Sequence, residues 1–147
     1  MPTLIIRPDS VISSSGFADS GDTLKGKIND NNTNTSSAQT STSASIVCSF
    51  ANDSTYSSAT INNVTFSIIA ALGGRAEEAS VAFVLNSLDN DVQTGSLSIE
   101  GAEPATFSGS ATTSVNSPAK VDGLIVTITP DSNGIVLYEV FVTVDYT

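Results

Sequence analysis

The segment 135–146 places the strongest constraint on how this chain can fold. It reads Ile-Val-Leu-Tyr-Glu-Val-Phe-Val-Thr-Val-Asp-Tyr, with apolar or aromatic residues at every even position. The odd positions begin apolar and become polar at Thr143 and Asp145. Alternation with a period of two is typical of a β-strand with one buried face. We therefore expect a central strand whose even positions, from Val136 to Tyr146, face the core.

Glu139 is the exception within this strand, because it places a carboxylate among apolar neighbours. A charged group that leaves water without a partner is costly. We therefore expect Glu139 either to reach solvent at the rim of the sheet or to find a partner.

Similar strand patterns recur along the chain between clusters of turn residues. The turn signal at 130–134 predicts that 124–129 returns as an antiparallel hairpin onto 135–146. Short strands at regular spacing in a chain of 147 residues predict an all-β fold, a single-domain antiparallel β-sandwich of jelly-roll type. The expected strands are 3–6, 23–29, 46–50, 61–72, 81–85, 93–100, 104–113, 124–129 and 135–146.

We expect residues 1–8 to form an N-terminal arm or edge strand and residues 9–147 to form the sandwich domain. The arm carries Leu4, Ile5 and Ile6 in succession, so one of its faces has apolar groups to cover. An exposed strand edge can add to a neighbouring sheet. We predict that these three residues and Arg7 contact a partner, although the arm could equally belong to the protein's own sheet.

The segment 30–45 consists almost entirely of Asn, Thr, Ser, Gln and Ala. Such a composition predicts a long polar loop, which contacts with another molecule would most easily order. We name Asn31, Asn32 and Asn34 as candidate partner-binding residues. They would contribute hydrogen-bonded specificity more than hydrophobic affinity.

The charge balance excludes several classes of partner. The chain has 15 acidic and 5 basic residues, a net charge of −10 and a pI near 4.1. Nucleic-acid binding needs clustered Lys and Arg, so no nucleic acid is expected as a partner.

No membrane association is expected either. The longest apolar run, around 140–144, is too short for a membrane span, and the first residues lack the pattern of a signal peptide.

Catalytic chemistry finds little support in the sequence. The chain has no histidine and one cysteine, so no Ser-His-Asp or Cys-His system and no His-ligated zinc can be built. Glu77 and Glu78 are adjacent and are interpreted as solvated loop acids, because glycosidase carboxylates converge across a cleft. Cys48 alternates with Ile46 and Phe50, which predicts a buried, inert thiol. We therefore predict no enzymatic activity and no cofactor.

Two Asp/Asn-rich stretches, 29–32 and 89–91, offer closely spaced oxygens of the kind that calcium uses. Neither matches the spacing of an EF-hand loop, and Asp and Asn are also ordinary turn residues. We interpret both as unliganded turns and predict no metal site.

Several segments together resemble small jelly-roll domains in structural proteins of tailed bacteriophages. They are Leu-Ile-Ile-Arg-Pro-Asp at 4–9, a Gly-containing turn before a strand that ends in Asn-Asp, Val-Thr-Phe-Ser-Ile at 64–68 and Tyr-Glu-Val-x-Val-x-Val-x-Tyr at 138–146. The resemblance implies a virion protein, such as a capsid decoration or cement protein or a tail or fibre module.

The expected function is that of a non-enzymatic virion protein, which docks on the major capsid protein or another virion protein and forms a homo-oligomer. The alternative is a carbohydrate-binding jelly-roll module of a tail or fibre protein. The chain has no tryptophan and three tyrosines, two of them on the expected inward face of 135–146, which leaves few rings to stack on sugars. An enzyme with a carboxylate-only or metal site ranks below both.

Overall fold

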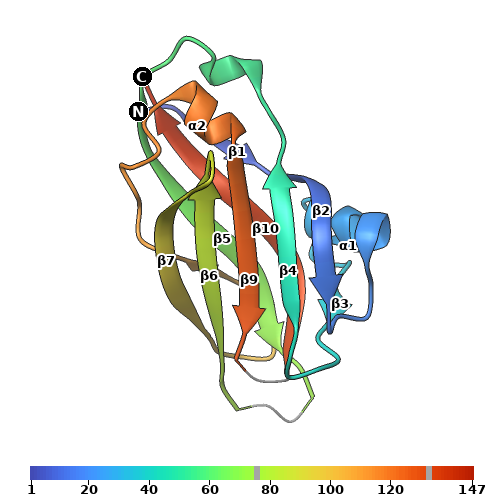
Figure 1. Cartoon of the computed structure of the whole chain (residues 1–147). Helices are drawn as coiled ribbons and strands as arrows, with labels where there is room; N and C mark the ends of the chain where they lie inside the picture. The colour runs from blue at the N-terminus through green and yellow to red at the C-terminus, as the bar shows by residue number, and fades with distance from the viewer. Residues whose placement is uncertain (75–76, 132–133) are drawn as a thin grey trace.

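The computed structural model describes residues 1–74, 77–131 and 134–147, and it forms two antiparallel sheets packed face to face (Figure 1). Strands hold 54% of the described residues and helices 11%, so the predicted all-β sandwich is confirmed. The first sheet contains, in spatial order, β1 (Thr3–Ile6), β10 (Ile135–Tyr146), β5 (Ile61–Leu72) and β8 (Ala105–Ser108), with β3 (Ser37–Ala38) also paired to β10. The second contains β2 (Pro8–Ser15), β4 (Ser45–Phe50), β9 (Leu124–Pro130), β6 (Ala79–Ser87) and β7 (Asn90–Ile99).

Most strands lie where the alternation predicts them. The strand expected at 104–113 is confined to the four residues of β8, and β2 was not predicted because three of its residues are consecutive serines. The predicted inward faces of β4 and β5 are confirmed by burial. Alternation predicts Ile46, Cys48 and Phe50 inward on β4, and in the same way it predicts Val64, Phe66, Ile68 and Ala70 inward on β5; all seven are buried.

The central strand β10 changes face part-way along its length. Its register against β5 shifts between Leu137 and Glu139, as in a β-bulge. Before the shift the odd positions face the core, and after it the even positions do. The predicted inward face is therefore right within 140–144 and wrong for Val136 and Tyr138, which are half-buried. An extra residue reverses the orientation of a whole strand segment, and a period of two cannot reveal it.

The hairpin predicted between 124–129 and 135–146 is wrong. β9 pairs with β4 and β6, whereas β10 pairs with β1, β3 and β5 in the opposite sheet. The connection that follows Pro130 therefore crosses from one sheet to the other. A turn signal marks where the chain reverses, but it does not say which sheet receives the next strand.

The strand predicted at 23–29 is also wrong, because this segment forms the helix α1 (Gly21–Ile28). Leu24 and Ile28 are both fully buried. They lie four residues apart, a spacing that fits one face of a helix as well as it fits alternation in a strand. The helix packs beside β2 and closes one side of the sandwich (Figure 1).

A shorter helix, α2 (Pro118–Asp122), and a 3₁₀ turn, η1 (Ser54–Tyr56), lie at the end of the sandwich where the two termini meet (Figure 1). The backbone amide of Tyr146 donates to the carbonyl of Pro2 there, at 3.2 Å. Within the described ranges, neither helix is long and apolar enough to cross a membrane.

Candidate functional site

The N-terminal strand β1 belongs to the protein's own sheet. It pairs with β10 from Thr3 opposite Asp145 to Ile6 opposite Val142, so this part of residues 1–8 is an edge strand. Ile6 is 4% exposed and Leu4 packs against the core. Of the apolar residues predicted to contact a partner, Ile5 alone points outward, with 49% of its surface exposed.

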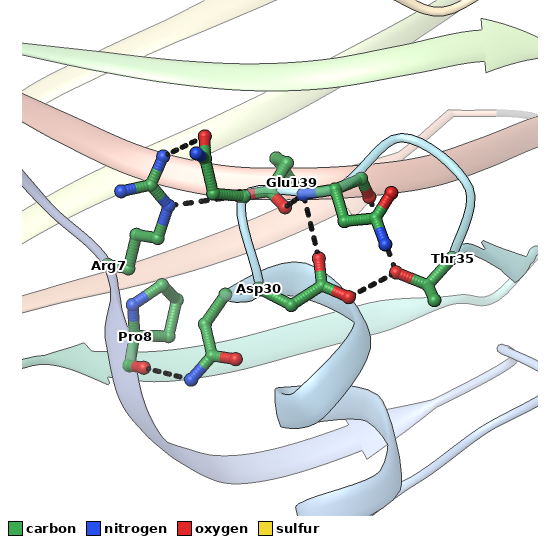
Figure 2. Close-up of polar contacts among 8 residues, drawn as sticks. Arg7, Pro8, Asp30, Thr35 and Glu139 are labelled. Carbon is green, nitrogen blue, oxygen red and sulfur yellow. Dashed lines mark hydrogen bonds and ion pairs between the residues drawn. The ribbon is translucent and has the colours of Figure 1, made fainter.

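The predicted partner-binding residue Arg7 lies in a polar network around Glu139 (Figure 2). The carboxylate of Glu139 is 1% exposed and accepts from Arg7 Nε at 3.2 Å and from the backbone amide of Asn32 at 2.9 Å. Arg7 Nη2 also donates to Asn31 Oδ1 at 2.7 Å. The buried carboxylate has thus found partners, and Arg7, Asn31 and Asn32 are engaged by the protein itself.

The loop after α1 is ordered by its own hydrogen bonds. The amide of Asn32 donates to Asp30 Oδ1 at 3.0 Å as well as to Glu139, and the hydroxyl of Thr35 donates to Asp30 Oδ2. The amide of Asn34 donates to Asn32 Oδ1 at 2.9 Å, while the side chain of Asn34 is exposed. Of the three asparagines proposed from the sequence, Asn34 is thus the one that bonds neither Glu139 nor Arg7.

The two carboxyl groups of this network have opposite pKa shifts. Burial raises the pKa of Glu139; the Asn32 amide and the Arg7 guanidinium oppose the rise, and a hydrogen bond with Asp30 adds to it. Burial also raises the pKa of Asp30, but hydrogen bonds with Thr35, Glu139 and Asn32 outweigh that effect and hold it below its ordinary value.

The two Asp/Asn-rich stretches lie in the loop after α1 and at the turn from β6 into the start of β7. No group of three or more His, Cys, Asp and Glu side chains among the residues that the structure describes is placed to hold a metal ion. Leu88 and Asp89 have positive φ angles of 50° and 66° and make the tight turn between β6 and β7. The carboxylate of Asp91 accepts a hydrogen bond from the side-chain amide of Asn86 (Nδ2) at 3.1 Å. This stretch therefore has the structural role of a turn.

A cleft lies where β6 of the second sheet begins and its neighbours β7 and β9 end. These strand ends are at the lower end of the molecule in Figure 1. β6 and β7 pair so that Ser80 lies opposite Ser98 and Ala79 opposite Ile99. The cavity volume is about 460 Å³. Its lining consists of Glu78, Ala79, Ser80, Ser98, Ile99, Glu100 and Asp131.

Asp131 is fixed against the cleft by two backbone contacts. Its carboxylate accepts from the amide of Ser80 at 3.0 Å, and its own amide donates to the Ser80 carbonyl at 2.9 Å. The hydroxyl of Ser80 is hydrogen-bonded to that of Ser96 at 2.6 Å. Among the lining residues, Ile99 and Ala79 are buried, and the side chains of Glu78, Glu100 and Ser98 are exposed.

The cleft brings several hydrogen-bond acceptors and hydroxyl groups together in one concave site, and convergent polar groups of this kind are typical of a site for a small polar ligand. None of its described lining residues is aromatic. The sequence interpretation missed this site. The sequence predicts that Glu78 is a solvated loop acid, and the other lining residues lie in three segments that only the pairing of β9, β6 and β7 brings together. No local motif joins them.

The thiol of Cys48 belongs neither to the polar network around Glu139 nor to the cleft. It is fully buried between the sheets, as predicted, and burial raises its pKa to about 12. A thiol in this state is neither exposed nor ionised at neutral pH and is not a nucleophile.

Comparison with known proteins relates the chain to others by structure alone. No protein-family model and no curated protein sequence matches it. The fold is similar to that of the C-terminal family 6 carbohydrate-binding module (CBM6) of LamC, a marine laminarinase from Zobellia galactanivorans. That likeness has a TM-score of 0.59 and 11% sequence identity, and it covers 97% of this chain and 98% of the other. At this identity the comparison establishes the shared β-sandwich.

Proposed function

We propose that this protein is a non-catalytic carbohydrate-binding module. The observation that carries the proposal is the likeness to a carbohydrate-binding module over nearly the whole of both chains. The absence of histidine from the sequence agrees with a binding role, because it removes the commonest general base. This function was the alternative interpretation of the sequence, and it now has more support than capsid decoration.

The cleft lined by Glu78, Ser80, Ser98, Glu100 and Asp131 is the site we assign to the sugar. Its volume of about 460 Å³ lies within the range of small-ligand pockets, which is roughly 300–1,000 Å³. Carboxylates accept hydrogen bonds from sugar hydroxyls, and such charge-assisted bonds are stronger than neutral ones. Without an aromatic platform among the described lining residues, we expect recognition by hydrogen bonding and a modest affinity for a single sugar chain.

A glycan array followed by titration calorimetry tests this function. Laminarin oligosaccharides are the first ligands to try, because the similar module comes from a laminarinase. Glu100→Gln and Ser98→Ala should each weaken binding of a glycan found on the array, since both side chains line the cleft. Glu103→Gln is the matched control, because Glu103 is an exposed acid outside the lining.

Two results would count against this function. If no neutral, acidic or amino sugar on the array binds, the protein is not a carbohydrate-binding module. If a glycan binds and the cleft variants bind it as well as Glu103→Gln does, the sugar site lies elsewhere on the sandwich.

The virion setting is a second proposal, and it rests on the sequence resemblance together with the exposure of Ile5. Ile5 is 49% exposed on the edge strand β1, where another sheet or a capsid surface could cover it. The partner would be a capsid or other virion protein, or a further copy of this chain. Cosedimentation with undecorated particles tests this proposal. The unmodified protein should sediment with the particles, and Ile5→Asp should abolish this cosedimentation. Equal sedimentation of Ile5→Asp and the unmodified protein would exclude docking through β1.

A further inference from the structure

Two carboxyl groups from distant parts of the chain converge on one backbone amide. The amide of Asn32 lies 3.0 Å from Asp30 Oδ1 and 2.9 Å from Glu139 Oε1 (Figure 2). Asp30 belongs to the loop after α1, and Glu139 follows the register shift of β10. The contact therefore holds this loop against the central strand of the first sheet.

The charges at this contact do not balance when both acids are ionised. Glu139 is 1% exposed, and Arg7 approaches it with Nε at 3.2 Å. One guanidinium then faces two carboxylates. Asp30 is exposed to solvent, so the uncompensated charge is costly on Glu139, from which water is excluded. A single proton shared between the two carboxyl groups removes the excess negative charge, as in other close carboxyl pairs.

We propose that Asp30 and Glu139 share one proton, and that this bridge fastens residues 30–35 to β10 in acidic solution and loosens as the pH rises. The hydroxyl of protonated Glu139 donates to the carboxylate of Asp30. Asp30 is the partner that stays ionised, because its side chain is exposed to solvent and accepts from the hydroxyl of Thr35, whereas Glu139 is buried.

The other cations near this region are held elsewhere in the described structure. Lys27 lies 2.9 Å from Asp19, and Lys25 lies 3.7 Å from Asp22. On the β5 side, the residue paired with Glu139 is Ile69, which has no titratable group. Arg7 and Asp30 are therefore the charged groups that face Glu139 from the elements packed against it.

The pH window follows from the directions of the two pKa shifts. The pKa of Glu139 is raised above 4.5. The stability that its bound proton adds to the contact is therefore fully present below pH 4.5 and is lost as the pH rises through the folded-state pKa. The pKa of Asp30 is lowered below 3.8, so its contribution is lost only as the pH falls through that lower pKa. The bridge is thus complete at pH values between the folded-state pKa of Asp30 and the folded-state pKa of Glu139.

Amide hydrogen exchange at Asn32, followed by NMR, tests this proposal. The protection factor, which corrects for intrinsic exchange, should be highest in the window around 3.8 to 4.5 and lower at neutral pH. The fall should be roughly tenfold for each unit by which the pKa of Glu139 exceeds its ordinary value. Glu139→Gln keeps a hydrogen-bond donor beside Asp30 at every pH, so its protection factor should not depend on pH.

Glu103→Gln is the control, since Glu103 is an exposed acid outside this network. A pH dependence in Glu139→Gln equal to that of the unmodified protein would overturn the proposal. If Glu139→Gln does not fold, the carboxyl carbon shifts of the unmodified protein decide the matter. Glu139 should then titrate above its ordinary range and Asp30 should respond in the same step, whereas two independent titrations would exclude a shared proton.

Discussion

The hydroxyl of Tyr56 donates a 2.7 Å hydrogen bond to the carboxylate of Asp122 and accepts one from the amide of Asp53 at 3.2 Å. The two side chains come from η1 and α2, and Tyr56 and Asp122 are 66 positions apart in the sequence. Tyr56 is completely buried. This contact therefore ties together two connections at the end of the sandwich where the termini lie.

Tyr56→Phe should destabilise the protein by about 1–3 kcal/mol, because it leaves an acceptor and a donor without their partner. The change would be measured as the free energy of unfolding in urea at neutral pH. Asn90→Ala is a useful control, since its exposed side chain bonds only the nearby carbonyl of Leu88 among the described contacts. A loss no larger than that of the control would show that the Tyr56 contact contributes little.

The same tyrosine should affect stability at alkaline pH. Burial, followed by the hydrogen bond to Asp122, raises the pKa of Tyr56 to about 12 from an ordinary value of 10.0. Its contribution is therefore present below the unfolded-state value and is lost as the pH rises through the folded-state value. The unmodified protein should lose stability between these two values more steeply than Tyr56→Phe does. Parallel curves would contradict this assignment.

Gly95 and Gly109 approach the ring of Phe83 too closely to accept a side chain. An added Cβ would lie 2.7 Å from a ring atom at either position, and Phe83 is itself packed against Phe66 with ring centroids 4.7 Å apart. Gly95→Ala and Gly109→Ala should each destabilise the protein by about 1–3 kcal/mol through overpacking. Thermal unfolding would measure the effect.

Gly26→Ala provides the opposite result as a control. Gly26 lies within α1, and an added Cβ there meets no atom within 4 Å. This substitution should stabilise the protein by about 0.5–1 kcal/mol, because alanine favours a helix interior over glycine. If all three glycine variants behave alike, the close approach to Phe83 is not what decides the stability.

Arg7→Gln should destabilise the protein by about 2 kcal/mol, because it leaves the buried carboxylate of Glu139 without its cation. Arg7 is itself 27% exposed, so solvent screening keeps the loss below that of a fully buried ion pair. Lys25→Gln is the matched control, since its partner Asp22 is fully exposed and no loss is expected. Equal stability of Arg7→Gln and Lys25→Gln in chemical denaturation would show that Arg7 does not compensate Glu139.

Cys48 should not react with a thiol reagent in the native protein. It is fully buried, and its pKa of about 12 keeps it protonated at neutral pH. Labelling should begin only when denaturant unfolds the sandwich. Mass spectrometry of the native protein after brief exposure to the reagent checks this, and rapid labelling would show that β4 has a different inward face.

The sequence by itself determined which segments form most strands and which way many of their side chains point. Alternation placed Ile46 and Phe50 inward on β4, and it identified Glu139 as a carboxylate in need of a partner. These features are local, because successive side chains of a strand point to opposite faces whatever the partner strand is.

Only the tertiary structure decided which strands are neighbours and which residues lie together at the strand ends. Three features depend on contacts between distant segments. They are the position of the bulge before Glu139, the place of β9 in the sheet opposite β10, and the helical state of Leu24 to Ile28. The cleft likewise exists because the start of β6 lies beside the ends of β7 and β9. A period of two records the orientation of each side chain but not its long-range partner, so the candidate sugar site required the folded chain.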